Sequence, residues 1–112
     1  MQLGALVPFG DIGGSPATVR DYALGLEAAG FDFVEAPDHV LGVNVASRPD
    51  WEAGRNTSED LFHDPFVLLS YLAGITTLGF STGVLIVPQR QTALVAKQAA
   101  CLDVLSEGRF RL

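Results

Sequence analysis

Short apolar runs alternate along the chain with longer segments in which apolar residues recur at helical spacing. The runs are too short for helices, and most of them are followed by glycine or proline, which is typical of buried strands. We therefore predict strands at residues 3–9, 31–36, 80–87 and 109–112. Helices are predicted between them, opening at Pro16, Pro65 and Thr92.

Residues at the predicted helix ends support these boundaries. Ser15 and Asp64 each precede a proline. Their side-chain oxygens can accept hydrogen bonds from the unpaired amides of the first helical turn, and proline at the first helical position already has a helical φ. Gly30 and Gly108 follow the first and third helices, where glycine commonly ends a helix. The third helix, at 92–105, places one group of side chains on one side: Leu94, Val95, Gln98, Leu102 and Leu105.

Strands and helices alternate strictly in this order, which predicts an α/β fold with a parallel sheet and right-handed crossovers. Two closures are compatible with the alternation, an open doubly wound sheet and a (β/α)8 barrel. A complete barrel takes about 250 residues. The 112 residues therefore correspond to a little under half of a barrel, about three and a half βα units, with 1–112 as one partial domain that stops at the start of the fourth strand.

One connection is unusually long. Residues 41–63 separate the second strand from the second helix, and connections beyond about 12–15 residues are uncommon unless they are functional or disordered. The segment follows a strand, so it emerges on the face where barrels and open α/β sheets both place their sites. A functional loop and a tolerated surface insertion remain equally compatible with the sequence.

Composition narrows the class of protein. The net charge is −6 and the few Lys and Arg residues are scattered, which argues against a nucleic-acid partner. No apolar run approaches the roughly 18 residues that would span a bilayer. The N-terminus lacks the basic region of a signal peptide, so we expect a cytoplasmic protein without a membrane partner.

Cysteine and histidine usage gives little support for a metal site. Cys101 is the only cysteine, and in its Ala/Leu-rich helix we interpret it as a small core residue rather than a reactive thiol. His39 and His63 are the only histidines, and no HxH or HExxH spacing occurs. We therefore predict no metal, and we expect His63 to pack over the start of the second helix.

Asp38 and His39 follow the second strand and are the first candidates for chemistry. The acid can hold the orientation of the imidazole, or both side chains can present hydrogen-bonding groups to a bound ring. An unperturbed histidine pKa of about 6.5 suits proton transfer near neutrality. A polar pair that merely caps the loop is the alternative.

Gly83 interrupts the third predicted strand, which usually marks a bulge or a close approach by a ligand. The glycines of this chain do not form GxGxxG, so no dinucleotide-binding fingerprint is present. Arg90 follows the same strand and could meet an anion or a ring edge. Simple solvation of this arginine is the interpretation that we favour.

Three segments together resemble the luciferase-like monooxygenase family. They are FDFVEAPDHVLG at 31–42, HDPFVLLSYLAGIT at 63–76 and LGFSTGVLIVPQRQTALVAKQAACLDVLSEGRFRL at 78–112. The three segments cover nearly the whole chain and follow one another in the order of the family. Their combination is a specific signal of the family, whereas each segment alone is a weak one. The wording PQRQTALVAKQA is most similar to the branch that uses coenzyme F420 rather than FMN.

The resemblance implies the N-terminal half of a (β/α)8 TIM barrel and an oxidoreductase with a small-molecule substrate, expected as a homo-oligomer. Asp38 and His39 match the pair near the reactive face of the cofactor ring, with His39 as proton donor or acceptor. Gly83-Val84 matches the strand bulge with a cis non-prolyl peptide that backs the ring. The loops after strands seven and eight, which commonly hold phosphate in barrels, lie outside these residues.

Several functions therefore stay open. The first is hydride transfer to or from an organic substrate with F420, and the second is FMN-dependent monooxygenation. In both, the protein orients the substrate and the cofactor and excludes water from them, while the cofactor carries the chemistry. An inactive fragment, a self-associating half-barrel and a binding module are the alternatives for the 112 residues alone, and we expect these residues to bind neither cofactor well.

Overall fold

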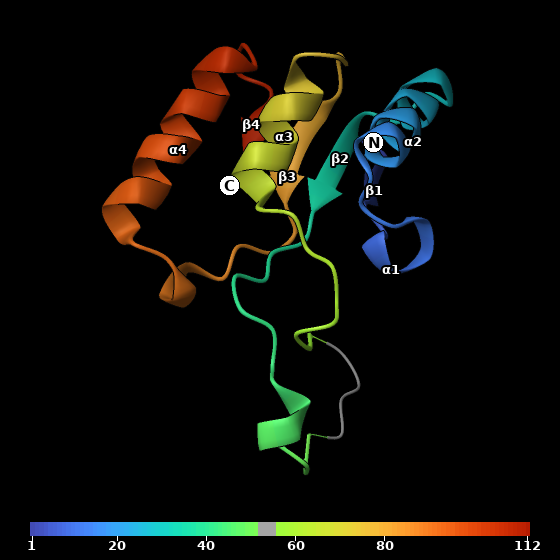
Figure 1. Ribbon diagram of the computed structural model, residues 1–112. Helices are drawn as coiled ribbons and strands as arrows, with labels where there is room; N and C mark the ends of the chain where they lie inside the picture. Colours follow the sequence, from blue (N-terminus) through green and yellow to red (C-terminus); the bar gives the residue numbers. More distant parts are fainter. Residues whose placement is uncertain (52–55) are drawn as a thin grey trace.

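A computed structural model describes residues 1–51 and 56–112 and contains a parallel sheet (Figure 1). Its strands lie in sequence order and are β1 (Gly4–Leu6), β2 (Phe33–Ala36), β3 (Gly79–Thr82) and β4 (Phe110–Arg111). Every neighbouring pair is parallel. The predicted α/β architecture with crossover helices is confirmed.

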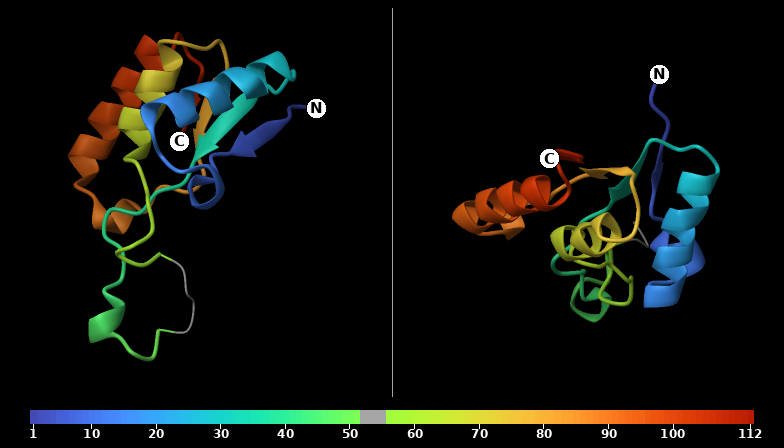
Figure 2. Two further views of the ribbon diagram at one scale, coloured as in Figure 1. Left: turned by 45° about the vertical axis from the view of Figure 1, so that its right-hand side comes forward. Right: turned by 90° about the horizontal axis from the view of Figure 1, so that it is seen from above.

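Three longer helices connect the strands: α2 (Pro16–Ala28), α3 (Pro65–Ala73) and α4 (Thr92–Leu105). The oxygens of Ser15 and Asp64 accept the amides of Thr18 and Val67, each at 3.1 Å, so both predicted N-caps are present. All three helices lie on one side of the curved sheet (Figure 2). The opposite side carries no helix in the described part of the chain, as in one wall of a barrel.

The hydrophobic core fills the space between the sheet and these helices. Val34 and Ala36 of β2 and Phe80 of β3 are buried on the helix side of the sheet. The helices contribute most of the remaining core residues, among them Val19, Ala23, Leu26, Phe66, Leu69, Leu72, Val95 and Leu102. The core thus anchors the sheet and leaves its strand ends free to carry polar groups.

All four strands are shorter than predicted, and the first and third end well before their predicted ends. The run at 3–9 forms β1 only as far as Leu6, and a short helix α1 (Phe9–Ile12) follows because Pro8 has no amide and its carbonyl accepts the Asp11 and Ile12 amides. The run at 80–87 leaves the sheet after Thr82. Beyond it stands a 3₁₀ turn, η2 (Val87–Gln89).

The predicted side of the third helix is only partly buried. Val95 and Leu102 of α4 enter the core, whereas Leu94 and Leu105 are exposed. Cys101 is also exposed, so its interpretation as a core residue is wrong. Only a narrow stripe of α4 contacts α3 and the sheet, because the helix lies at the end of the row of helices (Figure 2).

The long connection leaves the body of the protein through a narrow neck (Figure 1). Val43 and Thr57 form an isolated bridge, in which the Val43 amide donates to Asn56 at 2.7 Å and the Ser58 amide donates to Val43 at 2.9 Å. Gly42 lies against this neck, where a Cβ would fall 2.0 Å from the Thr57 carbonyl oxygen. A short 3₁₀ helix, η1 (Val45–Ser47), lies beyond it.

Within the described residues, no helix combines the length and the apolar character that crossing a membrane requires.

Candidate functional site at the strand ends

The residues singled out from the sequence lie together at the carboxyl ends of β2 and β3. Ala36 and Thr82, the last residues of these strands, are partners in the register. The Gly83 amide donates to the Ala36 carbonyl at 2.9 Å, and the Ile86 amide donates to the Asp38 carboxylate at 2.9 Å. The fold therefore brings the segments 37–39 and 83–86 side by side.

Asp38 is held by an arginine rather than by its neighbouring histidine. Its side chain is 1% exposed and that of Arg90 is 10% exposed. Arg90 donates to both carboxylate oxygens, from Nε at 2.9 Å and from Nη2 at 2.5 Å. Its remaining Nη1 donates to Asp64, the N-cap of α3, at 2.8 Å. The interpretation of Arg90 as a solvated side chain is wrong.

The ion pairs keep Asp38 charged in spite of its burial. Burial alone would raise the pKa of Asp38, but the hydrogen bonds from Arg90 and Ile86 and the charge of Arg90 outweigh it, so the pKa lies below its ordinary value. The hydrogen bond to Asp38 in turn raises the pKa of Arg90. Asp38 is therefore a fixed anion that links the connection after β2 to the connection after β3.

His39 makes different contacts. Its Nδ1 lies 2.9 Å from the Leu41 carbonyl oxygen, which fits a proton on Nδ1 and leaves Nε2 as the basic nitrogen. Its ring lies 5.4 Å from the Phe62 ring, measured between centroids. The backbone of its own loop and an aromatic neighbour therefore orient this imidazole, and Asp38 makes no hydrogen bond to it in the described residues.

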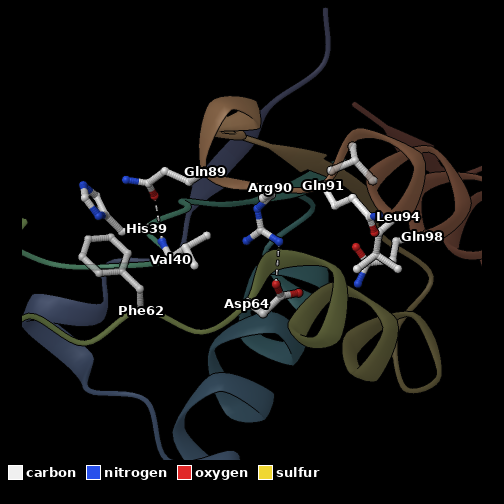
Figure 3. Close-up of a pocket in the computed structure, with 10 residues that line it drawn as sticks. His39, Val40, Phe62, Asp64, Gln89, Arg90, Gln91, Leu94 and Gln98 are labelled. Atoms are coloured by element: carbon white, nitrogen blue, oxygen red, sulfur yellow. Dashed lines mark hydrogen bonds and ion pairs between the residues drawn. The ribbon is translucent and has the colours of Figure 1, made fainter.

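A cavity of about 390 Å³ opens beside His39, between the loop that precedes α3 and the start of α4 (Figure 3). Asp38, Gly83 and Val84 do not line it. Gln89 contributes one wall and accepts the Val40 amide at 3.2 Å. The lining residues are His39, Val40, Phe62, Asp64, Gln89, Arg90, Gln91, Leu94, Val95 and Gln98.

The peptide bond between Gly83 and Val84 is cis, as the family resemblance implies. Val84 is an apolar residue with 69% of its surface exposed. Gly83 lies against Glu35 of β2, where a Cβ would fall 3.0 Å from Glu35 Oε2. Sequence reasoning missed Glu35, although an acid between two buried residues of an apolar strand is a signal that alternation alone can detect.

His63 has a structural role that agrees with the prediction. Its Nε2 lies 2.8 Å from the Gly14 carbonyl oxygen, and its ring packs against Phe9 at 5.4 Å. It lies directly before α3 and joins this helix to the turn before α2. Among residues 1–51 and 56–112, no group of three or more His, Cys, Asp or Glu side chains is placed to hold a metal ion.

Solved structures with the same arrangement share the fold. The oxygenating constituent of 3,6-diketocamphane monooxygenase from Pseudomonas putida, in complex with FMN, has a TM-score of 0.71 and 19% identity, with 100% of this chain and 28% of that chain covered. Riboflavin lyase with modified FMN and riboflavin has a TM-score of 0.68 and 24% identity, covering 98% and 28% of the two chains. The monooxygenase RslO1 from Streptomyces bottropensis has a TM-score of 0.65 and 20% identity, covering 100% and 32%.

The chain therefore spans about a third or less of the length of these structures. A search of curated proteins gives no significant match. The family comparison is decisive, because the profile described as luciferase-like monooxygenase matches residues 1–112, from one end of the chain to the other. With its parallel strands and crossover helices forming the first part of a TIM barrel, the chain belongs to the luciferase-like monooxygenase family.

Proposed function

We propose that this chain supplies the ring-facing part of a flavin or deazaflavin site in an oxidoreductase that acts on a small organic molecule. The observation that carries the proposal is that the loop with His39 lies beside the segment with Gly83 and the exposed Val84, at the ends of adjacent strands, in a chain of this family. Barrel enzymes place their sites on this face.

The residues present fit a flat ring. Gly83 has no side chain and the exposed Val84 offers an apolar surface, so an aromatic ring can approach the backbone there. His39 holds a basic Nε2 for proton transfer to or from the substrate. Asp38 contributes through Arg90, since their ion pair fixes the backbone on which His39 stands. The cofactor, when bound, supplies the hydride chemistry.

Coenzyme F420 is the cofactor that we propose first, on the resemblance of PQRQTALVAKQA at 88–99 to the F420 branch. FMN-dependent monooxygenation is the second candidate, favoured by two solved neighbours whose structures contain FMN or modified FMN. Parallel fluorescence titrations with F420 and FMN separate them. Tighter binding of FMN than of F420 would contradict the first assignment, and binding of neither in a complete barrel would contradict both.

We also propose that turnover needs βα units beyond those in this chain, because its solved neighbours are about three times longer. The 112 residues alone should then bind either cofactor more weakly than micromolar. Size-exclusion chromatography with light scattering tests the alternative of a self-associating half-barrel. A well-behaved dimer that binds cofactor at micromolar concentration would support that alternative over ours.

We further propose a cytoplasmic, homo-oligomeric enzyme.

A further inference from the structure

The helix-free face of the sheet carries a row of side chains across all strands. Leu6 of β1, Glu35 of β2, Ser81 of β3 and Arg111 of β4 are successive partners in the register. Side chains alternate between the two faces along a strand. Because Val34 and Ala36 are buried on the helix side, Glu35 faces the helix-free side that a barrel encloses (Figure 2).

Glu35 is the acid in this row, and it has no partner in the described residues. No hydrogen bond or ion pair joins its carboxylate to any side chain or backbone group in residues 1–51 and 56–112. Arg111, the cation of the same row, donates to Gln2 at 2.8 Å and lies over the Phe33 ring at 5.8 Å. Two strand spacings, about 10 Å, separate Arg111 from Glu35.

The position of the carboxylate connects Glu35 to the proposed ring site. Its Oε2 lies over Gly83, at 3.0 Å from the place of an absent Cβ, and the exposed Val84 comes next. Glu35 is only partly buried, so water solvates its charge as long as this face is open. A ligand that packs on Gly83-Val84 displaces that water and must offer a donor in its place, since an unpaired buried carboxylate is costly.

We infer that Glu35 is a ligand-binding residue whose carboxylate accepts a hydrogen bond from an N–H group of the ring that packs on Gly83-Val84. Flavins and deazaflavins both carry such a donor on their pyrimidinedione ring. A hydrogen bond to a charged acceptor is stronger and shorter than a neutral one. The inference deepens the proposed function and rests on it, because it needs a ring at Gly83.

FMN titrations followed by two-dimensional ¹H–¹⁵N NMR test the inference, since this method detects the weak binding that we expect of the chain alone. The variants are Glu35→Gln, which keeps the size but removes the charge, and Asp103→Asn, which removes an exposed acid on α4 as the matched control. Glu35→Asp retains the charge at a shorter reach. Thermal melts of each variant verify that the fold is kept.

We expect FMN to shift the amide signals of Gly83 and Val84 in the wild type. The dissociation constant should rise by up to about tenfold in Glu35→Gln, because the neutral amide oxygen is a weaker acceptor than the carboxylate, and less in Glu35→Asp. Asp103→Asn should bind like the wild type. FMN methylated at the ring N–H should bind the wild type at least as weakly as FMN binds Glu35→Gln. The affinity for the methylated FMN should be about the same in the wild type and in Glu35→Gln.

Failure of the inference and failure of the proposed function give different results. Shifts at Gly83 and Val84 with equal FMN affinity in the wild type and Glu35→Gln would overturn the role of Glu35 alone. The absence of any shift at these amides, at millimolar FMN and in a complete barrel as well, would overturn both. Equal loss of affinity in Asp103→Asn would also overturn the inference, because it would indicate a general charge effect.

Discussion

Replacing Arg90 by methionine should destabilise the fold more than any change to an exposed charge. The substitution keeps an unbranched side chain of similar length but removes all the guanidinium hydrogen bonds to Asp38 and Asp64. Asp38, with 1% of its side chain exposed, would retain only the hydrogen bond from the Ile86 amide. A charged group would then be left buried without a counter-ion.

The expected magnitude follows from this geometry. Breaking a buried ion pair by removing one partner costs about 3–5 kcal/mol. We expect the lower end, about 3 kcal/mol, because the side chain of Asp64 is 35% exposed and can return to water. A small domain has a free energy of unfolding of about 5–15 kcal/mol, so this loss is a large fraction. With a urea dependence of about 1–3 kcal/mol per molar, the unfolding midpoint should fall by about 1–3 M.

Urea unfolding followed by circular dichroism measures the effect, with Arg20→Met as the matched control. Arg20 pairs with Asp21 at 2.8 Å, but the two side chains are 47% and 66% exposed, so this control should leave the midpoint unchanged. The double variant Asp38→Asn with Arg90→Met should recover part of the loss, because it leaves no buried charge. Equal midpoints for Arg90→Met and Arg20→Met, or a double variant no more stable than Arg90→Met, would refute the reasoning.

Further predictions concern catalysis, pH, the thiol and the loop neck. In a complete barrel, His39→Ala should lower turnover far more than the melting temperature, and equal losses of both would count against its catalytic role. Folding lowers the pKa of Asp38, so the stability that its charge contributes should be fully present above the ordinary value of 3.8 and lost as the pH falls through the lower folded value. The difference in urea midpoint between the wild type and Asp38→Asn, followed across this pH range, measures this contribution. Cys101 is exposed, so a thiol reagent should label it in the folded chain at the rate of a free thiol, and slow labelling would contradict the exposure. Gly42→Ala places a Cβ 2.0 Å from the Thr57 carbonyl oxygen and should speed proteolysis within 43–57 while the melting temperature changes little; an unaltered cleavage rate would argue against the neck.

The order and type of the main elements could be predicted from the sequence because local signals agree with the tertiary structure. Ser15-Pro16 and Asp64-Pro65 mark helix starts whose capping bonds are present. The strand ends were predicted less well, since an apolar residue can serve equally in a strand or a turn. Val87 continues an apolar run in the sequence, yet it begins a 3₁₀ turn after the chain has left the sheet at Thr82.

The candidate site was predictable in position but not in its contacts. Asp38 and His39 are adjacent in sequence, which suggests an acid that orients an imidazole. The structure instead pairs Asp38 with Arg90, 52 residues away, and no spacing rule on a single strand can indicate that contact. Glu35 can be noticed in the sequence as an acid within an apolar strand, but its proposed role depends on Gly83 of the neighbouring strand, which the sequence alone does not place beside it.

The narrow neck of the long connection has a consequence for engineering this chain. The bridge between Val43 and Thr57 brings the two ends of the loop together. Between this bridge and the sheet, hydrogen bonds join Gln89 to Val40 and Arg90 to Asp64. Changes to the described residues beyond the neck should therefore have little effect on the strand ends. We therefore expect residues 44–51 to accept a newly grafted recognition segment without a change at the candidate site.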